Sequence, residues 1–163
     1  MFLSMLFLIA LSTSTDPTCK ATPEMVAFAQ ARGFSLEREM SGGIDGREPR
    51  SSVCADVDAD GSEDFCTILE SKNKGWKAGC FITWEGRVQF EEFETSQTRE
   101  NRAPVAPEAL SLSVVSKGRK VEWGNGAAEV KLLRDCIEFG VLESGAAMYC
   151  YNGGLFLGMV MGD

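Results

Sequence analysis

The chain has 163 residues, a formal net charge of −8 at pH 7 and no His. The excess of acidic over basic side chains makes nucleic acids and anionic membrane surfaces poor candidates for partners. The lack of His excludes Ser-His-Asp and Cys-His catalytic arrangements.

The chain begins with a short apolar run, residues 2–11, followed by small polar residues. The run is too short to span a bilayer and is typical of a secretory signal peptide, although no Lys or Arg precedes it. We therefore expect a signal peptide over residues 1–15 and one secreted or periplasmic domain over residues 16–163, with no membrane span in the mature chain. Cleavage is expected after Ser12, Ser14 or Thr15. A buried N-terminal strand or helix is the alternative interpretation.

One helix is predicted near the start of this domain. Thr22 is a suitable capping residue, Pro23 suits the first helical position, and Glu24 places an acid near the positive helix end. The helix is expected to end near Gly33. Apolar and polar residues then alternate over residues 34–36, which predicts a short strand.

The most informative segment is residues 56–64, which read Asp-Val-Asp-Ala-Asp-Gly-Ser-Glu-Asp. Aspartates occupy positions 1, 3, 5 and 9 of this segment, which is the ligand order of a calcium loop. Gly61 at position 6 allows a sharp turn, and Ser62 at position 7 offers a main-chain oxygen. Carboxylates this close repel one another unless a cation neutralises them. We predict a Ca²⁺ site with the ligands Asp56, Asp58, Asp60, Ser62 and Asp64, and a solvated acidic turn is the alternative.

The flanks of this loop argue against an EF-hand. An EF-hand needs a bidentate Glu at position 12, where this chain has Thr67. Residues 51–54 and 65–69 are rich in β-branched and aromatic side chains, which favour strands over helices. The predicted arrangement is therefore strand, loop, strand.

The rest of the chain predicts antiparallel strands joined by tight turns. The predicted strands cover residues 76–84, 88–90, 112–115, 120–123, 130–133, 136–142, 147–151 and 155–160. A polar stretch over residues 91–107 separates a calcium-loop unit, residues 51–90, from a C-terminal hairpin unit, residues 110–163. The predicted fold class is mainly β (α+β): antiparallel hairpins with one N-terminal helix in a single disulfide-stapled domain.

Six cysteines follow the predicted signal peptide: Cys19, Cys54, Cys66, Cys80, Cys136 and Cys150. An even number behind such a segment indicates three disulfides, for which 15 connectivities exist. Two cysteine pairs have the same separation, and each brackets a strand–turn–strand pattern, so their members face each other across a hairpin. This predicts Cys66–Cys80 and Cys136–Cys150, and Cys19–Cys54 follows by elimination. The lack of His and of any Cys-x-x-Cys pair argues against zinc.

Residues 56–65 resemble the calcium loop of FG-GAP/VCBS-type repeats, in which Asp-x-Asp-x-Asp-Gly-x-x-Asp precedes a strand. The resemblance covers roughly residues 52–90. It implies side-chain ligation by the four aspartates and a main-chain ligand at Ser62. Such repeats usually occur in series and build β-propeller blades, whereas this chain has one convincing repeat and a propeller needs at least four blades. The chain also resembles small secreted bacterial proteins with one such loop.

Three tryptophans lie on predicted strands: Trp76, Trp84 and Trp123. Exposed together, they would stack on sugar rings or on a protein partner. Filling the core of the sheet is the alternative, and we favour it.

The function that we expect is a calcium-stabilised binding module without catalysis, whose partner is an unidentified protein or glycan. A secreted inhibitor or effector that displays a disulfide-held loop at residues 71–75 is one alternative. A hydrolase with paired carboxylates is another. Its candidate acids are Glu85, Glu91, Glu92 and Glu94.

Overall fold

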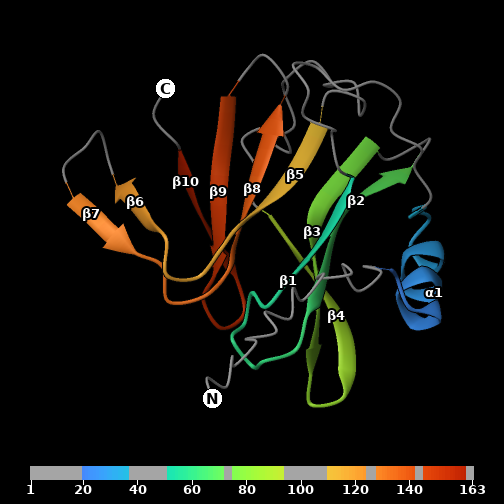
Figure 1. The fold of residues 1–163 in the computed structure, drawn as a ribbon. Coiled ribbons are helices and arrows are strands. Elements are labelled where there is room, and N and C mark those ends of the chain that lie inside the picture. The colour runs from blue at the N-terminus through green and yellow to red at the C-terminus, as the bar shows by residue number, and fades with distance from the viewer. Residues whose placement is uncertain are drawn as a thin grey trace, which may run out of the picture.

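Two four-stranded antiparallel sheets face each other in the computed structural model and enclose the main core (Figure 1). The structure describes residues 20–36, 51–71, 75–93, 110–123, 128–141 and 145–160. The first sheet has the strand order β1-β2-β3-β4, and the second has the order β10-β9-β8-β5. This confirms the predicted mainly β fold class. Within the described residues, no helix has the length and apolar character that a membrane crossing requires.

The first sheet is built from consecutive strands, whereas the second skips two strands of the chain. The first contains β1 (Ser52–Ala55), β2 (Asp64–Ser71), β3 (Gly75–Trp84) and β4 (Arg87–Glu92). The second contains β5 (Leu110–Val115), β8 (Cys136–Val141), β9 (Gly145–Tyr151) and β10 (Phe156–Val160). Between β5 and β8 the chain forms a separate hairpin, β6 (Lys120–Trp123) and β7 (Ala128–Lys131), at one side of the molecule (Figure 1).

The helix α1 (Pro23–Ala31) covers the outer face of the first sheet. Its N-terminus has the predicted cap, because the hydroxyl of Thr22 accepts a hydrogen bond from the N–H of Met25 at 3.3 Å. Met25 and Ala29 are buried, and the ring of Phe28 meets that of Phe81 edge-on at 5.6 Å. The helix therefore buries one face against the sheet, as amphipathic surface helices do.

Two predicted strands differ from those observed: one is reduced to a single bridge, and the other lies two residues earlier in the chain. The prediction for residues 34–36 reduces to one isolated bridge between Ser35 and Glu70, because the N–H of Phe34 bonds back to the helix carbonyl of Ala29. The prediction for residues 130–133 is wrong at its end. There β7 stops at Lys131, and Leu133 is 78% exposed.

The core between the sheets follows the alternation of side chains along each strand. Cys66 and Ile68 of β2 point inward, whereas Phe65 and Leu69 point outward to the helix. The fully buried Phe93, just after β4, fills the centre of the core. Its ring stacks on that of Tyr149 at 4.8 Å and meets that of Phe156 edge-on at 4.7 Å.

Two disulfides join neighbouring strands as predicted. Cys66 lies opposite Cys80 on β2 and β3, and the two are bonded. Cys136 and Cys150 are bonded across β8 and β9. Cys54 is also disulfide-bonded. Its predicted partner, Cys19, lies outside the described residues, as does the predicted signal peptide.

The two disulfides lie on different faces of their sheets, which reveals how the two units are stacked. Cys66 and Cys80 belong to the core between the sheets, but Cys136 and Cys150 face the outer cluster under the β6–β7 hairpin. Corresponding faces of the units therefore do not meet. The first sheet packs through the face that carries its disulfide, and the second packs through the face opposite its disulfide. The helix α1 covers the outer face of the first sheet, and the β6–β7 hairpin covers the outer face of the second.

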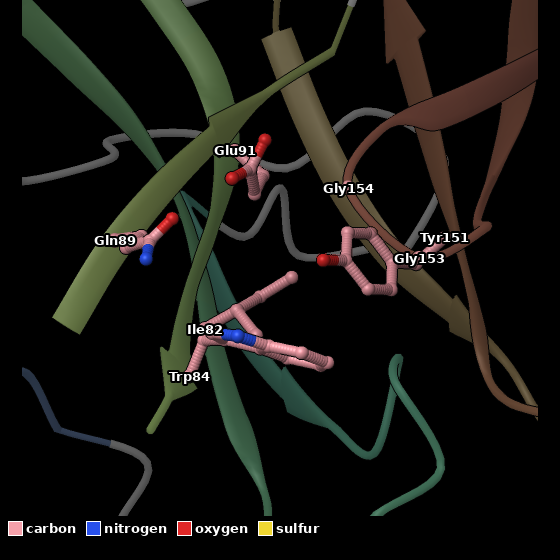
Figure 2. Close-up of a pocket in the computed structure, with 7 residues that line it drawn as sticks. All are labelled: Ile82, Trp84, Gln89, Glu91, Tyr151, Gly153 and Gly154. Carbon is pink, nitrogen blue, oxygen red and sulfur yellow. The ribbon is translucent and has the colours of Figure 1, made fainter. Parts of the chain in front are cut away.

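A pocket of about 150 Å³ opens between the sheets, where β3 ends near the β9–β10 turn. Figure 2 shows its walls: Ile82 and Trp84 from β3, Gln89 and Glu91 from β4, and Tyr151 with the two glycines that follow Asn152. The loop of residues 56–64 lies near this pocket, as the pairing of β2 with β3 shows. Continuing the Phe65–Phe81 pairing by one residue places Asp64 beside Ile82.

Candidate metal site

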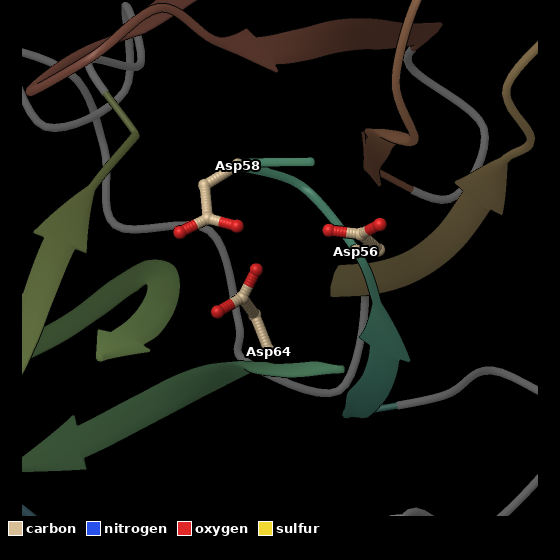
Figure 3. A group of neighbouring side chains, drawn as sticks. All are labelled: Asp56, Asp58 and Asp64. Atoms are coloured by element: carbon tan, nitrogen blue, oxygen red, sulfur yellow. The ribbon is translucent and has the colours of Figure 1, made fainter. Parts of the chain in front are cut away.

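Three of the predicted side-chain ligands converge at the turn between β1 and β2. Asp56 directly follows β1, Asp64 is the first residue of β2, and Asp58 lies in the turn between them. One carboxylate oxygen of each lies within 4.8 Å of the others. Figure 3 shows the three carboxylates around one common space. Two oxygens that share a Ca²⁺ at about 2.3–2.6 Å lie at most about twice that distance apart, so one ion fits this spacing.

Asp64 is the most buried of the three carboxylates. Its side chain is only 6% exposed, and one oxygen accepts a hydrogen bond from the N–H of Val57 at 3.1 Å. Burial, followed by the charge of Asp58, raises the pKa of Asp64 to about 7. The negative charge is thus disfavoured at this position unless a positive charge balances it.

Asp56 carries an acceptor atom with no donor. Its Oδ1 is buried and has no hydrogen-bond partner within the described part of the chain. An unsatisfied buried acceptor costs about 1–3 kcal/mol. A coordinated cation removes this cost, and Figure 3 shows a carboxylate oxygen of Asp56 turned toward Asp58.

The backbone of the loop is held by its own aspartates. The N–H of Asp60 donates to Oδ1 of Asp58 at 3.1 Å, and the N–H of Ser62 donates to Oδ1 of Asp60 at 2.7 Å. Gly61 has φ +91°, which suits its predicted role in the sharp turn, and Ala59 also has a positive φ of 65°. Such turns, closed by Asp side chains, order the loop before any ion binds.

The structure does not bring all five predicted ligands together. Asp60 and Ser62 are exposed, and the carboxylate of Asp60 is not part of the group whose oxygens lie within 4.8 Å. The Asp60 carboxylate instead accepts a hydrogen bond from the N–H of Ser62, just as the Asp58 carboxylate accepts one from the N–H of Asp60. Ligation by Asp60 and by the Ser62 main-chain oxygen therefore stays a prediction.

Asp135 is a residue of this site that the sequence did not indicate. It precedes β8, and its Oδ2 accepts a hydrogen bond from the N–H of Asp56 at 3.3 Å. Its Oδ1 accepts one from the N–H of Lys117 at 2.7 Å. Asp135 therefore links the loop to two turns of the C-terminal unit. No local pattern around Asp135 signals a contact with a residue so distant in the chain.

The chemistry of the site favours a hard cation. Its donors are carboxylate oxygens, which suit Ca²⁺ and Mg²⁺, and the described residues offer no nitrogen or sulfur donor to the group. A loop of alternating aspartates adapts to the variable geometry of Ca²⁺ better than to the strict octahedron of Mg²⁺.

The three tryptophans that the sequence singled out do not lie together on one described surface. Trp76 packs on Phe139 with ring centroids 5.6 Å apart, as the core interpretation predicted. Trp84 is instead 56% exposed, so that interpretation is wrong for it, and the side chain of Trp123 lies outside the described part of the chain.

The candidate acids of the hydrolase interpretation are dispersed. Glu91 is the one acid that lines the described pocket, whereas Glu92 pairs with Lys77. Glu85 is exposed in the β3–β4 turn, and Glu94 lies outside the described residues. The loop of residues 71–75, which the inhibitor interpretation invoked, is only partly described, because residues 72–74 lie outside the described residues.

No model of a known protein family, no curated protein and no solved structure matches this chain.

Proposed function

We propose that this chain is a calcium-stabilised binding module of an oxidising compartment, either secreted or periplasmic. The observation that carries the proposal is the convergence of Asp56, Asp58 and Asp64 within 4.8 Å. Carboxylates that are so close and partly buried repel one another and lose hydration. A bound Ca²⁺ removes both penalties, so binding of the ion stabilises the fold.

The role of the ion in this proposal is structural. The ion holds the end of β1 against the start of β2, and Asp135 connects the same point to the second sheet. Because Asp64 lies beside Ile82 of the pocket wall, a fixed loop also fixes one side of the pocket. The loop leads directly into β2, which is the order that the resemblance to FG-GAP/VCBS-type repeats implies.

The disulfides support the proposed compartment. Two are present across hairpins, and none of the cysteines in the described part of the chain is free. Disulfides persist in oxidising compartments and are rare in the cytosol. Calcium sites of extracellular modules bind with a Kd of about 10⁻⁴–10⁻³ M, and we expect an affinity in this range.

Calorimetric titration of the oxidised protein with CaCl₂ tests the proposal, with MgCl₂ as the comparison ion. We expect one Ca²⁺ per chain and weaker binding of Mg²⁺. Asp58→Asn removes a ligand and should weaken Ca²⁺ binding about tenfold or more.

Glu63→Gln is the matched control for this titration. It removes one negative charge from the same loop at an exposed position that is not a predicted ligand. The control should bind Ca²⁺ nearly as the wild type does. Absence of binding to the folded wild type would overturn the proposal. Equal weakening in both variants would mean that the loop attracts cations only through its net charge.

A further inference from the structure

The pocket between the sheets presents an exposed aromatic face. Trp84 is 56% exposed, whereas Trp76 on the same strand packs against the core. In Figure 2 the Trp84 indole lies along one side of the pocket, and the hydroxyl of Tyr151 points into the space from β9. The Tyr151 ring is held in place by Phe156, at 5.3 Å between centroids. Exposed aromatic rings beside a pocket often mark a binding site.

The charge in the wall of this pocket is negative. Glu91 lines it, and its side chain makes no hydrogen bond or ion pair within the described residues. Burial raises the pKa of Tyr151, and the charges of Glu91, Asp58 and Asp64 act in the same direction, whereas a backbone hydrogen bond at Gly154 acts against them.

Among the described residues, no basic side chain lines the pocket to balance this charge. None of the seven lining residues is Lys or Arg. The nearby Arg134 donates to the main-chain oxygen of Tyr151 at 3.0 Å and is not one of the lining residues. As far as the described residues go, the pocket therefore combines an aromatic face with a carboxylate that no lining Lys or Arg balances.

We propose that this pocket binds an organic cation, with an ammonium group over the Trp84 indole and Glu91 as its counter-charge. An ammonium near the face of an indole is attracted by the negative potential of the ring. A neutral ligand would leave the Glu91 carboxylate without a partner. Because it names the ligand class of the binding module, this inference rests on the proposed function.

The shared chemistry, an ammonium group, occurs in two kinds of ligand: small quaternary amines and lysine side chains. Choline chloride and Nα-acetyl-lysine methylamide represent them. The neutral carbon isostere of choline, in which a tert-butyl group replaces the trimethylammonium group, has nearly the same shape without the charge. Methyl glucoside represents a neutral sugar.

Each compound is titrated into the oxidised, ¹⁵N-labelled full-length protein in CaCl₂, and ¹H–¹⁵N NMR shifts are followed. We expect choline, the lysine compound or both to shift the Trp84 indole N–H and the amides of Gln89 and Tyr151. The neutral isostere should bind about tenfold more weakly or not at all. Binding of choline alone would mean that the ligand is a small quaternary amine. Binding of the lysine compound would mean that the pocket accepts a lysine side chain of a peptide or protein.

Variants test the two groups that carry the inference. Trp84→Ala should abolish the response to the ammonium compounds, and Glu91→Gln should weaken it about threefold or more. Glu122→Gln, at an exposed position on β6, is the matched control and should bind as the wild type does. The comparison of choline with its isostere uses the wild type, so it does not depend on the folding of a variant.

Three results would overturn the inference: equal binding of choline and its isostere, binding of methyl glucoside without the ammonium compounds, or no shifts with any compound. The calcium titration of the same sample separates this inference from the proposed function. Ca²⁺ binding without a response to ammonium compounds would remove only the inference. Ammonium binding without Ca²⁺ binding would overturn the proposed calcium-stabilised module and leave the ammonium site in place.

Discussion

The carboxylate of Asp135 accepts a hydrogen bond from the backbone N–H of Asp56, which lies 79 residues earlier in the chain. The other oxygen of this carboxylate accepts a hydrogen bond from the N–H of Lys117, in the turn before β6. The first predicted ligand of the metal loop is thereby anchored to the C-terminal unit. Asp135 is a positioning residue for the site, since it bonds to the backbone of a ligand and is not one of the three converging carboxylates.

Asp135→Ala should therefore weaken both the fold and the proposed metal site. It removes two hydrogen bonds to a charged acceptor, so the free energy of unfolding in chelator should fall by about 1–3 kcal/mol. The affinity for Ca²⁺ should also fall, because Asp56 is no longer held in position. Urea unfolding and calcium titration measure the two effects. Glu122→Ala, an exposed acid on β6, is the control, and equal behaviour of the two variants would refute the positioning role.

The buried Asp64 predicts an unusual pH dependence for the calcium-free protein. Its folded pKa of about 7 exceeds the unfolded value of about 3.9. The folded state therefore holds the proton more tightly, and the free energy of unfolding should fall as pH rises between these values. The full decrease is on the order of 4 kcal/mol. Urea unfolding in chelator at about pH 5 and about pH 8 should show roughly 2.6 kcal/mol of this decrease, because the unfolded carboxyl is already mostly ionised at pH 5.

Asp64→Asn is the control for this pH dependence. It keeps a side-chain oxygen for the N–H of Val57 but has no carboxyl group to titrate, so much of the decrease should disappear. In the wild type, Ca²⁺ requires the charged carboxylate, and its affinity should rise through about pH 7. A free energy of unfolding of the wild type that stays constant or increases with pH in chelator would contradict the raised pKa of Asp64.

The two hairpin disulfides provide a matched pair for stability measurements. Each closes the same separation, 14 residues, so chain entropy predicts a similar contribution of about 3 kcal/mol for each. Cys66 and Cys80 are fully buried between the sheets, whereas Cys150 is only partly buried. Replacing both members of the inner pair by Ala should therefore cost more, because it also leaves a cavity. Urea unfolding of the two double variants tests this order, and the reverse order would argue against it.

The conformation of the loop predicts different effects for two small substitutions. Gly61 has φ +91°, and a Cβ at this position would meet open space, so Gly61→Ala should cost about 1–2 kcal/mol through backbone strain alone. Ala59 already has φ +65°, and Ala59→Gly removes that strain but adds entropy to the unfolded chain. Ala59→Gly should therefore leave the free energy of unfolding unchanged or raise it slightly. Equal destabilisation by both, measured by urea unfolding, would contradict the loop geometry.

Local patterns predicted much of this fold. The capping Thr22 and the following Pro23 located the helix, because these signals act within one turn. Alternating side chains located the strands, and the equal spacing of cysteines identified two disulfides. The spacing of aspartates also identified the group of Asp56, Asp58 and Asp64.

Contacts between distant parts of the chain could not be predicted in this way. The bond from Asp135 to Asp56 depends on how the two sheets face each other, and no periodicity encodes that. Trp84 resembles Trp76 in the sequence, but it lies at the very end of β3, where the core no longer covers it.

Thermal unfolding of the oxidised protein, with CaCl₂ and with a chelator, tests the structural role of calcium most directly. At a calcium concentration of about 100 times Kd, binding should add about 2.7 kcal/mol and raise the Tm by roughly 5–10 °C. At the same calcium concentration the rise should fall to about half or less in Asp58→Asn, because a tenfold weaker site adds only about 1.4 kcal/mol, and it should persist in Glu63→Gln. An identical Tm with calcium and with chelator in the wild type would contradict the account and leave the acidic loop as a solvated turn.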